Sequence, residues 1–178
     1  MMRKEKEIVK NFYNNFGWLK NTNGTYKDTF INVDMRPILD FYHKKICTRV
    51  KNCFSLSGRY FLDAGSGANP AYQYSAGYQC HVCIDLSKRG FLEAKSKLQK
   101  GVYVLADITK LPFRDNIFDA IFAAHVLYHV PKDEQEYAVR EFHRVLKSGG
   151  AVALSFIHAG TARLTLCSLR HRDYLKKL

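Results

Sequence analysis

The 178-residue sequence contains no apolar run long enough to cross a bilayer, and its first residues lack the apolar stretch of a secretory signal. These absences exclude a membrane-spanning class and predict a cytoplasmic protein.

Cysteine is also scarce. The five cysteines have no regular spacing in a chain large enough to bury its own core, so free thiols are expected. Cys80 and Cys83 have a zinc-like spacing, but positions three apart in a strand face opposite sides, so no metal is predicted.

Acidic residues are the third scarcity. The chain has 16 Asp and Glu against 28 Lys and Arg, a formal net charge of +12. Such a surplus can attract nucleic acid. The basic residues, however, are dispersed over stretches that resemble the solvent faces of helices. A solvated basic surface is therefore favoured over an RNA-binding footprint, which remains the open alternative.

The stretch 59–72, Arg-Tyr-Phe-Leu-Asp-Ala-Gly-Ser-Gly-Ala-Asn-Pro-Ala-Tyr, organises the rest of the chain. An apolar strand leads into a turn where Gly65 and Gly67 allow a tight bend and close approach of a ligand. Asn69 and Pro70 are preferred at helix starts, which predicts a helix with free N–H groups directed at the turn.

After this stretch the pattern alternates strand and helix, which predicts βαβ units and a parallel sheet. Strands are expected at 59–62, 78–84, 102–106, 120–124 and 151–157. A helix capped by Ser87 is expected over 88–99. A longer one begins near Pro131 and ends at Ser148-Gly149-Gly150. Asp119 is expected to anchor the start of the fourth strand.

Before the sheet, apolar residues at helical spacing predict a helix over 3–16 that Gly17 ends. A loop over 18–29 with an Asn23-Gly24 turn and a second helical stretch over 30–50 follow. Residues 1–55 are expected to form an N-terminal helical cap on a domain of residues 56–178, the two making one structural domain. The end of the chain, 158–178, is expected to be one basic helix.

Leu62-Asp63-Ala64-Gly65-Ser66-Gly67 resembles the first motif of class I S-adenosylmethionine-dependent methyltransferases, of the methyltransferase type 11 kind. Residues 107–120 and 141–150 resemble later segments of the same family, in the same order. The resemblance implies a Rossmann-like three-layer α/β sandwich with a mainly parallel sheet of order 3-2-1-4-5. A nicotinamide dinucleotide is disfavoured, because an acidic residue precedes the glycines and the third glycine of that fingerprint is missing.

The resemblance also implies where S-adenosylmethionine, and its product S-adenosylhomocysteine, would bind. Asp85, twenty-two residues beyond Asp63, stands where a carboxylate accepts from ribose hydroxyls, with Leu86 beside the adenine. Asp107 is placed to accept from the adenine amine and Ile108 to pack on the ring. The predicted cofactor-binding residues are Asp63, Ala64, Gly65, Gly67, Asp85, Leu86, Asp107, Ile108 and Ala124.

The segment after the fourth strand supplies candidates for catalysis. His125 and His129 are predicted as general bases and Tyr128 as a substrate contact, although a histidine in this loop also suits a purely structural hydrogen bond. Residues Tyr13, Trp18, Tyr26 and Arg36 are candidates for a lid over the cofactor and substrate, with simple helix packing as the alternative.

The chain ends about twenty residues after strand five, so the antiparallel strand pair that ends the family sheet is expected to be missing. Strand five would then be an exposed edge, which suggests a homodimer. The predicted function is methyl transfer to a small-molecule acceptor. An RNA (tRNA) methyltransferase and a truncated cofactor-binding protein without turnover are the alternatives. The Asn-Pro-Pro-aromatic motif of DNA and protein amino methyltransferases does not follow strand four.

Overall fold

The computed structural model describes residues 3–31 and 39–155. Its strands are β1 (Gly58–Ala64), β2 (Tyr78–Asp85), β3 (Val102–Leu105), β4 (Phe118–Ala124) and β5 (Leu146–Ser155). Its helices are α1 (Lys4–Phe12), η1 (Tyr13–Gly17), α2 (Lys27–Ile31), α3 (Leu39–Cys53), α4 (Tyr72–Ser75), α5 (Lys88–Lys97), η2 (Leu127–His129), η3 (Lys132–Glu134) and α6 (Gln135–Val145). No helix in this part of the chain has the length and apolarity needed to span a membrane.

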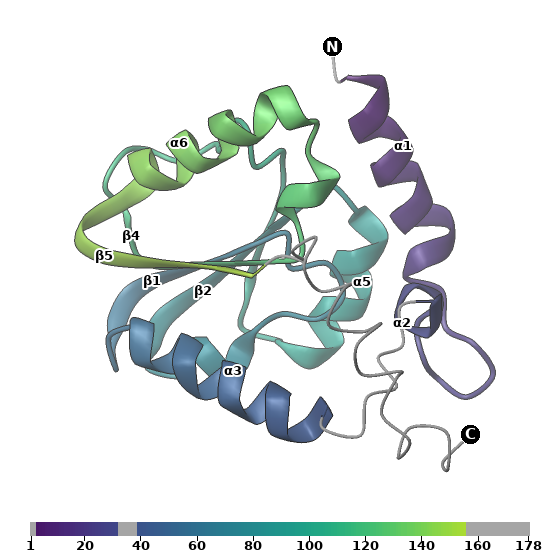
Figure 1. Cartoon of the computed structure of the whole chain (residues 1–178), viewed down its shortest axis with the longest axis horizontal. Helices are drawn as coiled ribbons and strands as arrows, with labels where there is room; N and C mark the ends of the chain where they lie inside the picture. Colours follow the sequence, from purple (N-terminus) through teal and green to yellow (C-terminus); the bar gives the residue numbers. More distant parts are fainter. Residues whose placement is uncertain (1–2, 32–38, 156–178) are drawn as a thin grey trace, which may run out of the picture.

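The strands form one sheet of order β3-β2-β1-β4-β5, and every pair in it is parallel. In the register, Leu62 of β1 lies between Val82 of β2 and Ile121 of β4. Helix α6 covers one face of the sheet and α3 the other (Figure 1). The predicted three-layer Rossmann-like fold and strand order are therefore confirmed.

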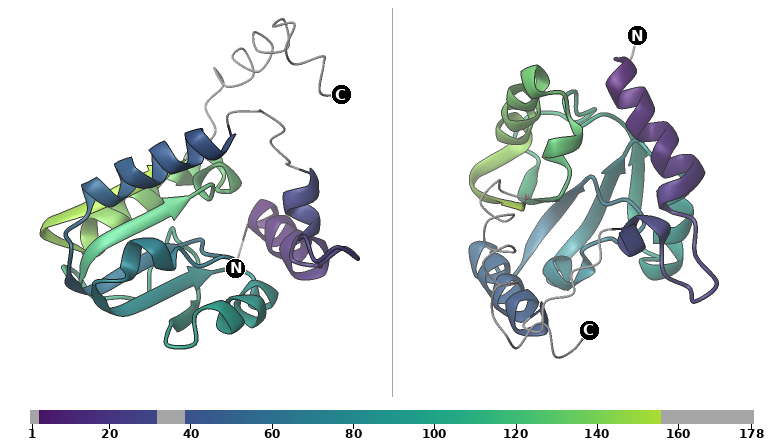
Figure 2. Two further views of the ribbon diagram at one scale, coloured as in Figure 1. Left: turned by 90° about the horizontal axis from the view of Figure 1, so that it is seen from below. Right: turned by 45° about the vertical axis from the view of Figure 1, so that its right-hand side comes forward.

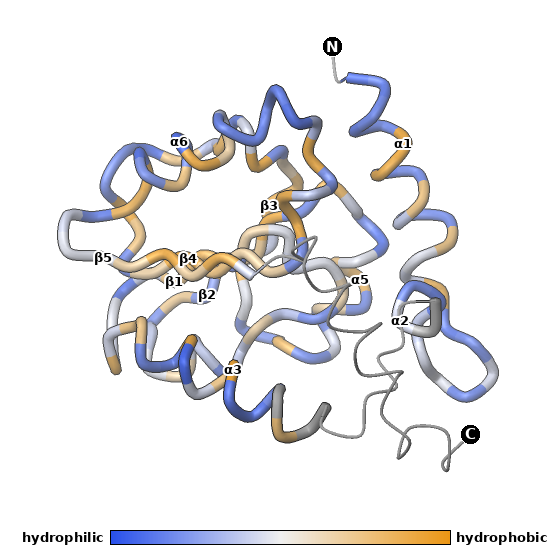
Figure 3. Tube along the Cα trace, in the orientation of Figure 1, coloured by the Kyte–Doolittle hydropathy of each residue, from blue (hydrophilic) through white to orange (hydrophobic). Residues whose placement is uncertain are grey.

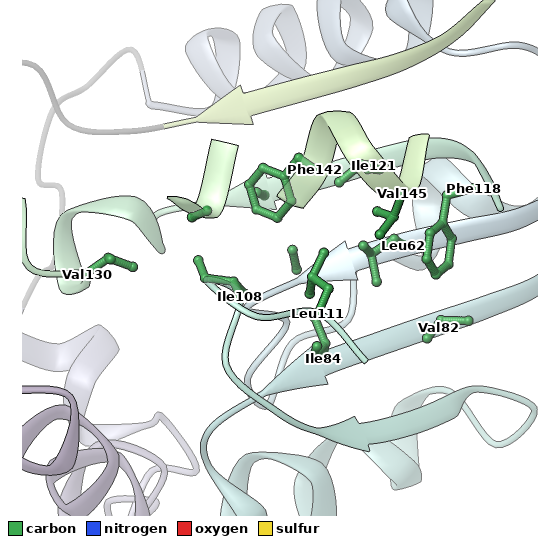
Figure 4. Close-up of a cluster of buried hydrophobic side chains, with 13 residues drawn as sticks. Leu62, Val82, Ile84, Ile108, Leu111, Phe118, Ile121, Val130, Phe142 and Val145 are labelled. Carbon is green, nitrogen blue, oxygen red and sulfur yellow. The ribbon is translucent and has the colours of Figure 1, made fainter. Parts of the chain in front are cut away.

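The main core lies between the sheet and α6. Leu62, Ile84 and Ile121 from three strands meet Phe142 and Val145 of α6, and none of the five is more than 1% exposed (Figure 4). Fully burying such a side chain stabilises the fold by roughly 1.5 to 3 kcal/mol. The central strands are apolar along their length while the helices keep polar outer faces, as Figure 3 shows.

The other face of the sheet has an aromatic core. Phe61 of β1 and Phe122 of β4 pack with Tyr74 of α4 and with Phe54, which follows α3. Strand residues alternate between the two faces, so neighbouring positions such as Phe61 and Leu62 serve different cores. This alternation explains the nearly continuous apolar runs of β1 and β4.

The predicted helix start at Asn69 and Pro70 is wrong. Helix α4 begins only at Tyr72, and the Ala71 N–H that precedes it donates to the Asp63 carboxylate at 2.7 Å. Asp63 is only 3% exposed, and a carboxylate buried to that extent needs hydrogen-bond donors. The helix entry is therefore built around Asp63 instead of an Asn cap.

The predicted end of the long helix is also wrong. Helix α6 ends at Val145, and the next residue already pairs with Phe118 of β4. The register then shifts between Phe118 and Ala120, which leaves residues 147–150 looped out of the ladder as a bulge, with Gly149 at a φ of +77°. Lys147 in this bulge pairs with Asp119 at 2.6 Å.

Asp119 anchors the start of β4, as predicted, because its Oδ2 accepts from the backbone N–H groups of Arg59 and Tyr60 at 2.9 and 2.8 Å. Ser87 caps α5 by accepting from the Gly90 N–H at 3.1 Å, also as predicted.

The expected helix over 3–16 is α1 continued by η1. Of the predicted helical stretch over 30–50, residues 30–31 belong to α2 and residues 39–50 to α3, and residues 32–38 lie outside the described residues. The predicted helix over 158–178 lies outside the described residues.

Candidate cofactor and active site

A cavity of about 300 Å³ lies at the carboxyl ends of β1, β2 and β4, where the order of the strands reverses. This is the position at which open α/β sheets bind ligands, and the volume is at the small end of the range for ligand pockets. The strands point toward α1 and α2, which stand across their tips (Figure 2). The cavity therefore has a floor of strand ends and a roof of N-terminal helices.

The glycine turn after β1 requires both of its glycines. Gly65 has a φ of +73° and Gly67 a φ of +51°, in the left-handed region that favours glycine. A Cβ at Gly65 would stand 2.4 Å from Cγ2 of Val126, and one at Gly67 2.3 Å from Cζ2 of Trp18. The turn is thus pressed between the loop after β4 and the segment after η1.

Asp85 at the end of β2 holds this turn in place. Its Oδ2 accepts from the Gly67 N–H at 2.9 Å and its Oδ1 accepts from the Ser87 N–H at 2.7 Å. Burial raises the pKa of Asp85 to about 6, although these hydrogen bonds favour the ionised form. The carboxylate lines the cavity, so it can also accept from hydroxyl groups of a bound ligand.

Asp63 faces a buried polar cluster behind the turn. Its Oδ2 lies 3.3 Å from Nε2 of His81, whose Nδ1 lies 2.7 Å from the Ser75 hydroxyl. The ligand atoms of Asp63, His81 and Cys83 lie within 4.8 Å of one another, but protein hydrogen bonds already engage Asp63 and His81. Cys80 packs in the core under α6 instead, so the two cysteines do face different sides of β2.

Asp107, the predicted adenine contact, is held by a lysine of the N-terminal helix α1, 101 residues away in the sequence. Lys6 of α1 places its Nζ 2.6 Å from Asp107 Oδ2 and 2.7 Å from the Thr109 hydroxyl, and it also pairs with Glu134. Burial acts to raise the pKa of Asp107, but the hydrogen bonds from Lys6 and Thr109 hold it below its usual value. The Lys6 side chain is 7% exposed. Sequence reasoning missed it because it resembles an ordinary solvent-facing helix lysine.

The two candidate bases lie at the end of β4. His125 has a φ of 55°, which costs a side chain of this type on the order of 1 kcal/mol, and its N–H donates to the Ser155 carbonyl at 2.7 Å. Burial lowers the pKa of both His125 and His129, so both imidazoles are neutral near pH 7. Strained residues of this kind concentrate at functional sites.

His129 meets the N-terminal segment directly. Its Nε2 lies 3.0 Å from the Tyr13 hydroxyl, and the two rings pack edge to face at 5.5 Å. Asp28, a residue that the sequence reasoning did not single out, lines the same cavity. Burial raises the pKa of Tyr13, so its hydroxyl keeps its proton.

The remaining candidate lid residues divide into two groups. The Trp18 ring stacks on Tyr13 at 5.1 Å and borders the cavity above Gly67. Tyr26 is buried against Trp18, with its hydroxyl on Glu93, and does not border the cavity. Arg36 lies outside the described residues.

The cavity brings together most of the residues predicted from the sequence. Those that line it are Tyr13, Trp18, Asp63, Gly65, Asp85, Leu86, Asp107, Ile108, Ala124, His125, Tyr128 and His129. Ala64 and Gly67 belong to the turn but do not border the cavity. The lining carries four carboxylates, from Asp28, Asp63, Asp85 and Asp107. Lys6 and Lys10 also line the cavity, and Lys6 is paired with Asp107, so the acidic groups still outnumber the basic ones. Such a lining suits a cationic nucleoside without phosphate groups.

Fold and site together define a nucleoside-binding α/β domain of the methyltransferase type. A family model described as "Methyltransferase domain" matches residues 62–154, more than half of the chain. The chain belongs to this family. The class I S-adenosylmethionine-dependent methyltransferase predicted from the sequence is thereby confirmed, and with it S-adenosylmethionine as the cofactor of the class.

Two relatives show the range of activities in the family. The chain is 33% identical to malonyl-[acyl-carrier protein] O-methyltransferase of Hamiltonella defensa over 103 residues, 57% of this chain and 39% of that protein. It is 34% identical to sterol methyltransferase-like 2 of Botryococcus braunii over 125 residues, 66% of this chain and 31% of that protein. The chain thus spans less than two fifths of the length of these relatives.

A solved structure matches a larger share of the chain than the family model does. Magnesium protoporphyrin IX methyltransferase from Synechocystis PCC 6803, with bound S-adenosylmethionine, has a TM-score of 0.65 at 19% identity. The match covers 89% of this chain and 79% of that one. At this identity the comparison establishes the shared fold alone.

Proposed function

We propose that this protein transfers a methyl group from S-adenosylmethionine to a small-molecule acceptor in the cavity between the strand ends and the N-terminal helices. The observation that carries the proposal is the composition of this cavity. Three carboxylates and a glycine turn lie at the strand ends, a fourth carboxylate, Asp28, comes from α2, and two neutral imidazoles follow β4. Relatives named for methylating a carried malonyl group and a sterol support a small-molecule acceptor.

The residues present fit the cofactor. Gly65 borders the cavity, and the two glycines let Val126 and Trp18 pack directly on the turn beside it. We assign Asp85 to the ribose hydroxyls, and Leu86, Asp107 and Ile108 to the adenine. When bound, S-adenosylmethionine supplies a methyl group attached to positively charged sulfur. A nucleophilic atom of the acceptor can bond to the methyl carbon and displace the sulfur.

The chain's own contribution is mainly to orient the acceptor. Because the methyl donor is already activated, holding the nucleophile about 3 to 3.5 Å from the methyl carbon supplies much of the rate. Tyr13, Trp18 and Tyr128 border the cavity from the roof side, where they can exclude water and contact the acceptor. We infer that α1, η1 and α2 are the working part of the cap predicted over 1–55.

Calorimetric titration of S-adenosylmethionine, S-adenosylhomocysteine and NADH into the purified chain tests the cofactor. Binding of the first two alone, weakened by Asp85→Ala, supports the proposal, whereas binding of NADH alone or of none of the three contradicts it. Release of S-adenosylhomocysteine with a panel of hydroxyl, amine, carboxylate, sterol and tRNA acceptors then tests the acceptor class. Turnover with tRNA only, with steep salt dependence, would replace the small-molecule assignment by the RNA alternative.

Two further expectations remain proposals. β5 is an edge strand of the described sheet, so we propose that it pairs with β5 of a second copy to form a homodimer. Light scattering that gives a monomer mass at assay concentrations would remove this proposal. We also propose a cytoplasmic location, which microscopy of a tagged chain in its host would test.

A further inference from the structure

We propose that Lys6 of α1 is a positioning residue that sets the base specificity of the cavity. Lys6 fixes Asp107 as a group that only accepts hydrogen bonds, and Asp107 then selects a base that carries an amino group. This inference rests on the proposed function, in which Asp107 is assigned to the adenine, and deepens it. Lys6 itself does not touch the base. It acts through Asp107, from a helix that precedes the whole sheet in the sequence.

The ammonium group of Lys6 is fully occupied by the protein. Lys6 is the buried residue of α1, and its Nζ contacts Asp107 Oδ2 at 2.6 Å, the Thr109 hydroxyl at 2.7 Å and the Glu134 carboxylate. An ammonium group has three N–H donors. These three acceptors take all of them, so Lys6 has no donor left for a ligand although it borders the cavity.

The hydrogen bonds to Asp107 leave a single acceptor position open. Its Oδ1 accepts from the backbone N–H and the hydroxyl of Thr109, both at 2.9 Å, and its Oδ2 accepts from Lys6. An ionised carboxylate offers about four lone-pair sites, two on each oxygen. By the contacts recorded in the described part of the chain, Oδ1 is therefore filled and Oδ2 has one site left. Asp107 lines the cavity, so this site can face a ligand.

An acceptor at this position separates purine bases by one group. Adenine presents an exocyclic amine, which donates, whereas an oxopurine presents a carbonyl oxygen there, which accepts. Two acceptors that face each other in a desolvated site leave both without a donor, and this costs free energy. As long as Asp107 is ionised, its Oδ2 therefore favours the aminopurine.

Lys6 decides whether Asp107 stays ionised. Burial acts to raise the pKa of Asp107, and the hydrogen bond from Lys6 is the largest effect that holds this pKa below its usual value. Lys6 is also the shared partner of Asp107 and Glu134, and two carboxylates without their common cation would repel each other. In the absence of Lys6 we expect Asp107 to take up a proton on Oδ2. A neutral Asp107 can donate from this oxygen, and the preference for an amine is then lost.

The test compares S-adenosylhomocysteine with S-inosylhomocysteine, in which a carbonyl oxygen replaces the adenine amine. Calorimetry on the purified full chain at pH 7.5 gives the ratio of the two Kd values. We expect the wild type to bind the adenine compound about 10- to 150-fold more tightly, the range for a hydrogen bond to a charged group. In Lys6→Met the ratio should fall toward one. Lys6→Gln also removes the charge and should give the same fall, so it serves in place of Lys6→Met if that variant does not fold.

Arg3→Met is the matched control. Arg3 anchors the same end of α1 through Asp133 and Glu134, and its recorded contacts do not include Asp107. Loosening of the helix alone should weaken the binding of both ligands alike, so Arg3→Met should keep the wild-type ratio. The other differences between the two bases are the same in every variant and cancel when the ratios are compared.

Two results would overturn the role of Lys6 while leaving the proposed function in place. One is a wild-type ratio that persists in Lys6→Met or Lys6→Gln. The other is an equal fall of the ratio in Arg3→Met. Binding of neither ligand to the wild type would instead overturn the proposed function, and this inference with it.

Discussion

We expect the raised pKa of Asp85 to make cofactor binding depend on pH, because we assign its carboxylate to the ribose hydroxyls. In the free protein this carboxyl group titrates at about 6 because it is buried. Ribose hydroxyls can be bound firmly only by its ionised form, so binding must first deprotonate the group when the pH is low. At pH 5 only about one molecule in eleven has an ionised Asp85, so the Kd of S-adenosylhomocysteine should be about tenfold higher than at pH 7.5.

The raised pKa of Asp85 also makes the stability of the free protein depend on pH. The pKa of Asp85 in the folded protein lies above the ordinary aspartate value of 3.8, so this group favours folding below that value and loses its contribution as pH rises through about 6. A shift of roughly two units corresponds to about 3 kcal/mol. A ligand that donates hydrogen bonds to the ionised carboxylate offsets part of this cost.

Calorimetry at pH 5.0 and 7.5 tests the prediction, with Asp85→Asn as the control. The amide has one carbonyl oxygen for the two N–H groups that Asp85 holds, and it does not titrate, so its weaker binding should be the same at both pH values. Repeating the titration near pH 6 in buffers of different ionisation enthalpy should show proton release. Equal Kd values at the two pH values in the wild type, or the full pH dependence surviving in Asp85→Asn, would refute the reasoning.

Two substitutions test the roof of the cavity. Gly67→Ala places a methyl group against the sole tryptophan, Trp18, and should cost about 1 to 3 kcal/mol of stability and shift its fluorescence to the red. Gly24→Ala has the same left-handed strain with nothing within 4 Å, so it should leave the emission unmoved. Lys6→Met should loosen α1 by about 1 to 3 kcal/mol, seen as faster amide exchange there, because it removes the ion pairs of Lys6 with Asp107 and Glu134. In the control Lys4→Met, which changes an exposed lysine, the amides of α1 should exchange at the wild-type rate. Exchange in α1 that stays as slow as in the wild type in Lys6→Met would contradict a stabilising role of the Lys6 ion pairs.

The sequence by itself determined the parallel sheet and which residues stand at the ends of its strands. The alternation of strands and helices predicted a parallel sheet, and the resemblance to the methyltransferase family implied its order 3-2-1-4-5. Gly65 and Asp85 could be placed because each stands at the end of a recognisable strand. Carboxyl ends of parallel strands meet at one edge of the sheet, so these residues converge wherever the remaining chain lies.

Only the tertiary structure decided what closes the pocket. Lys6 reaches Asp107 across 101 residues and Tyr13 reaches His129 across 116, and no local pattern marks either pair. The prediction of where α4 begins was wrong for the same reason, since the acceptor for the N–H group at its start is Asp63 and not the expected Asn69. Periodicity reports which side of an element is apolar. A polar partner is chosen by distance and desolvation once the elements are packed, because a buried charge or hydroxyl must find a partner wherever one lies.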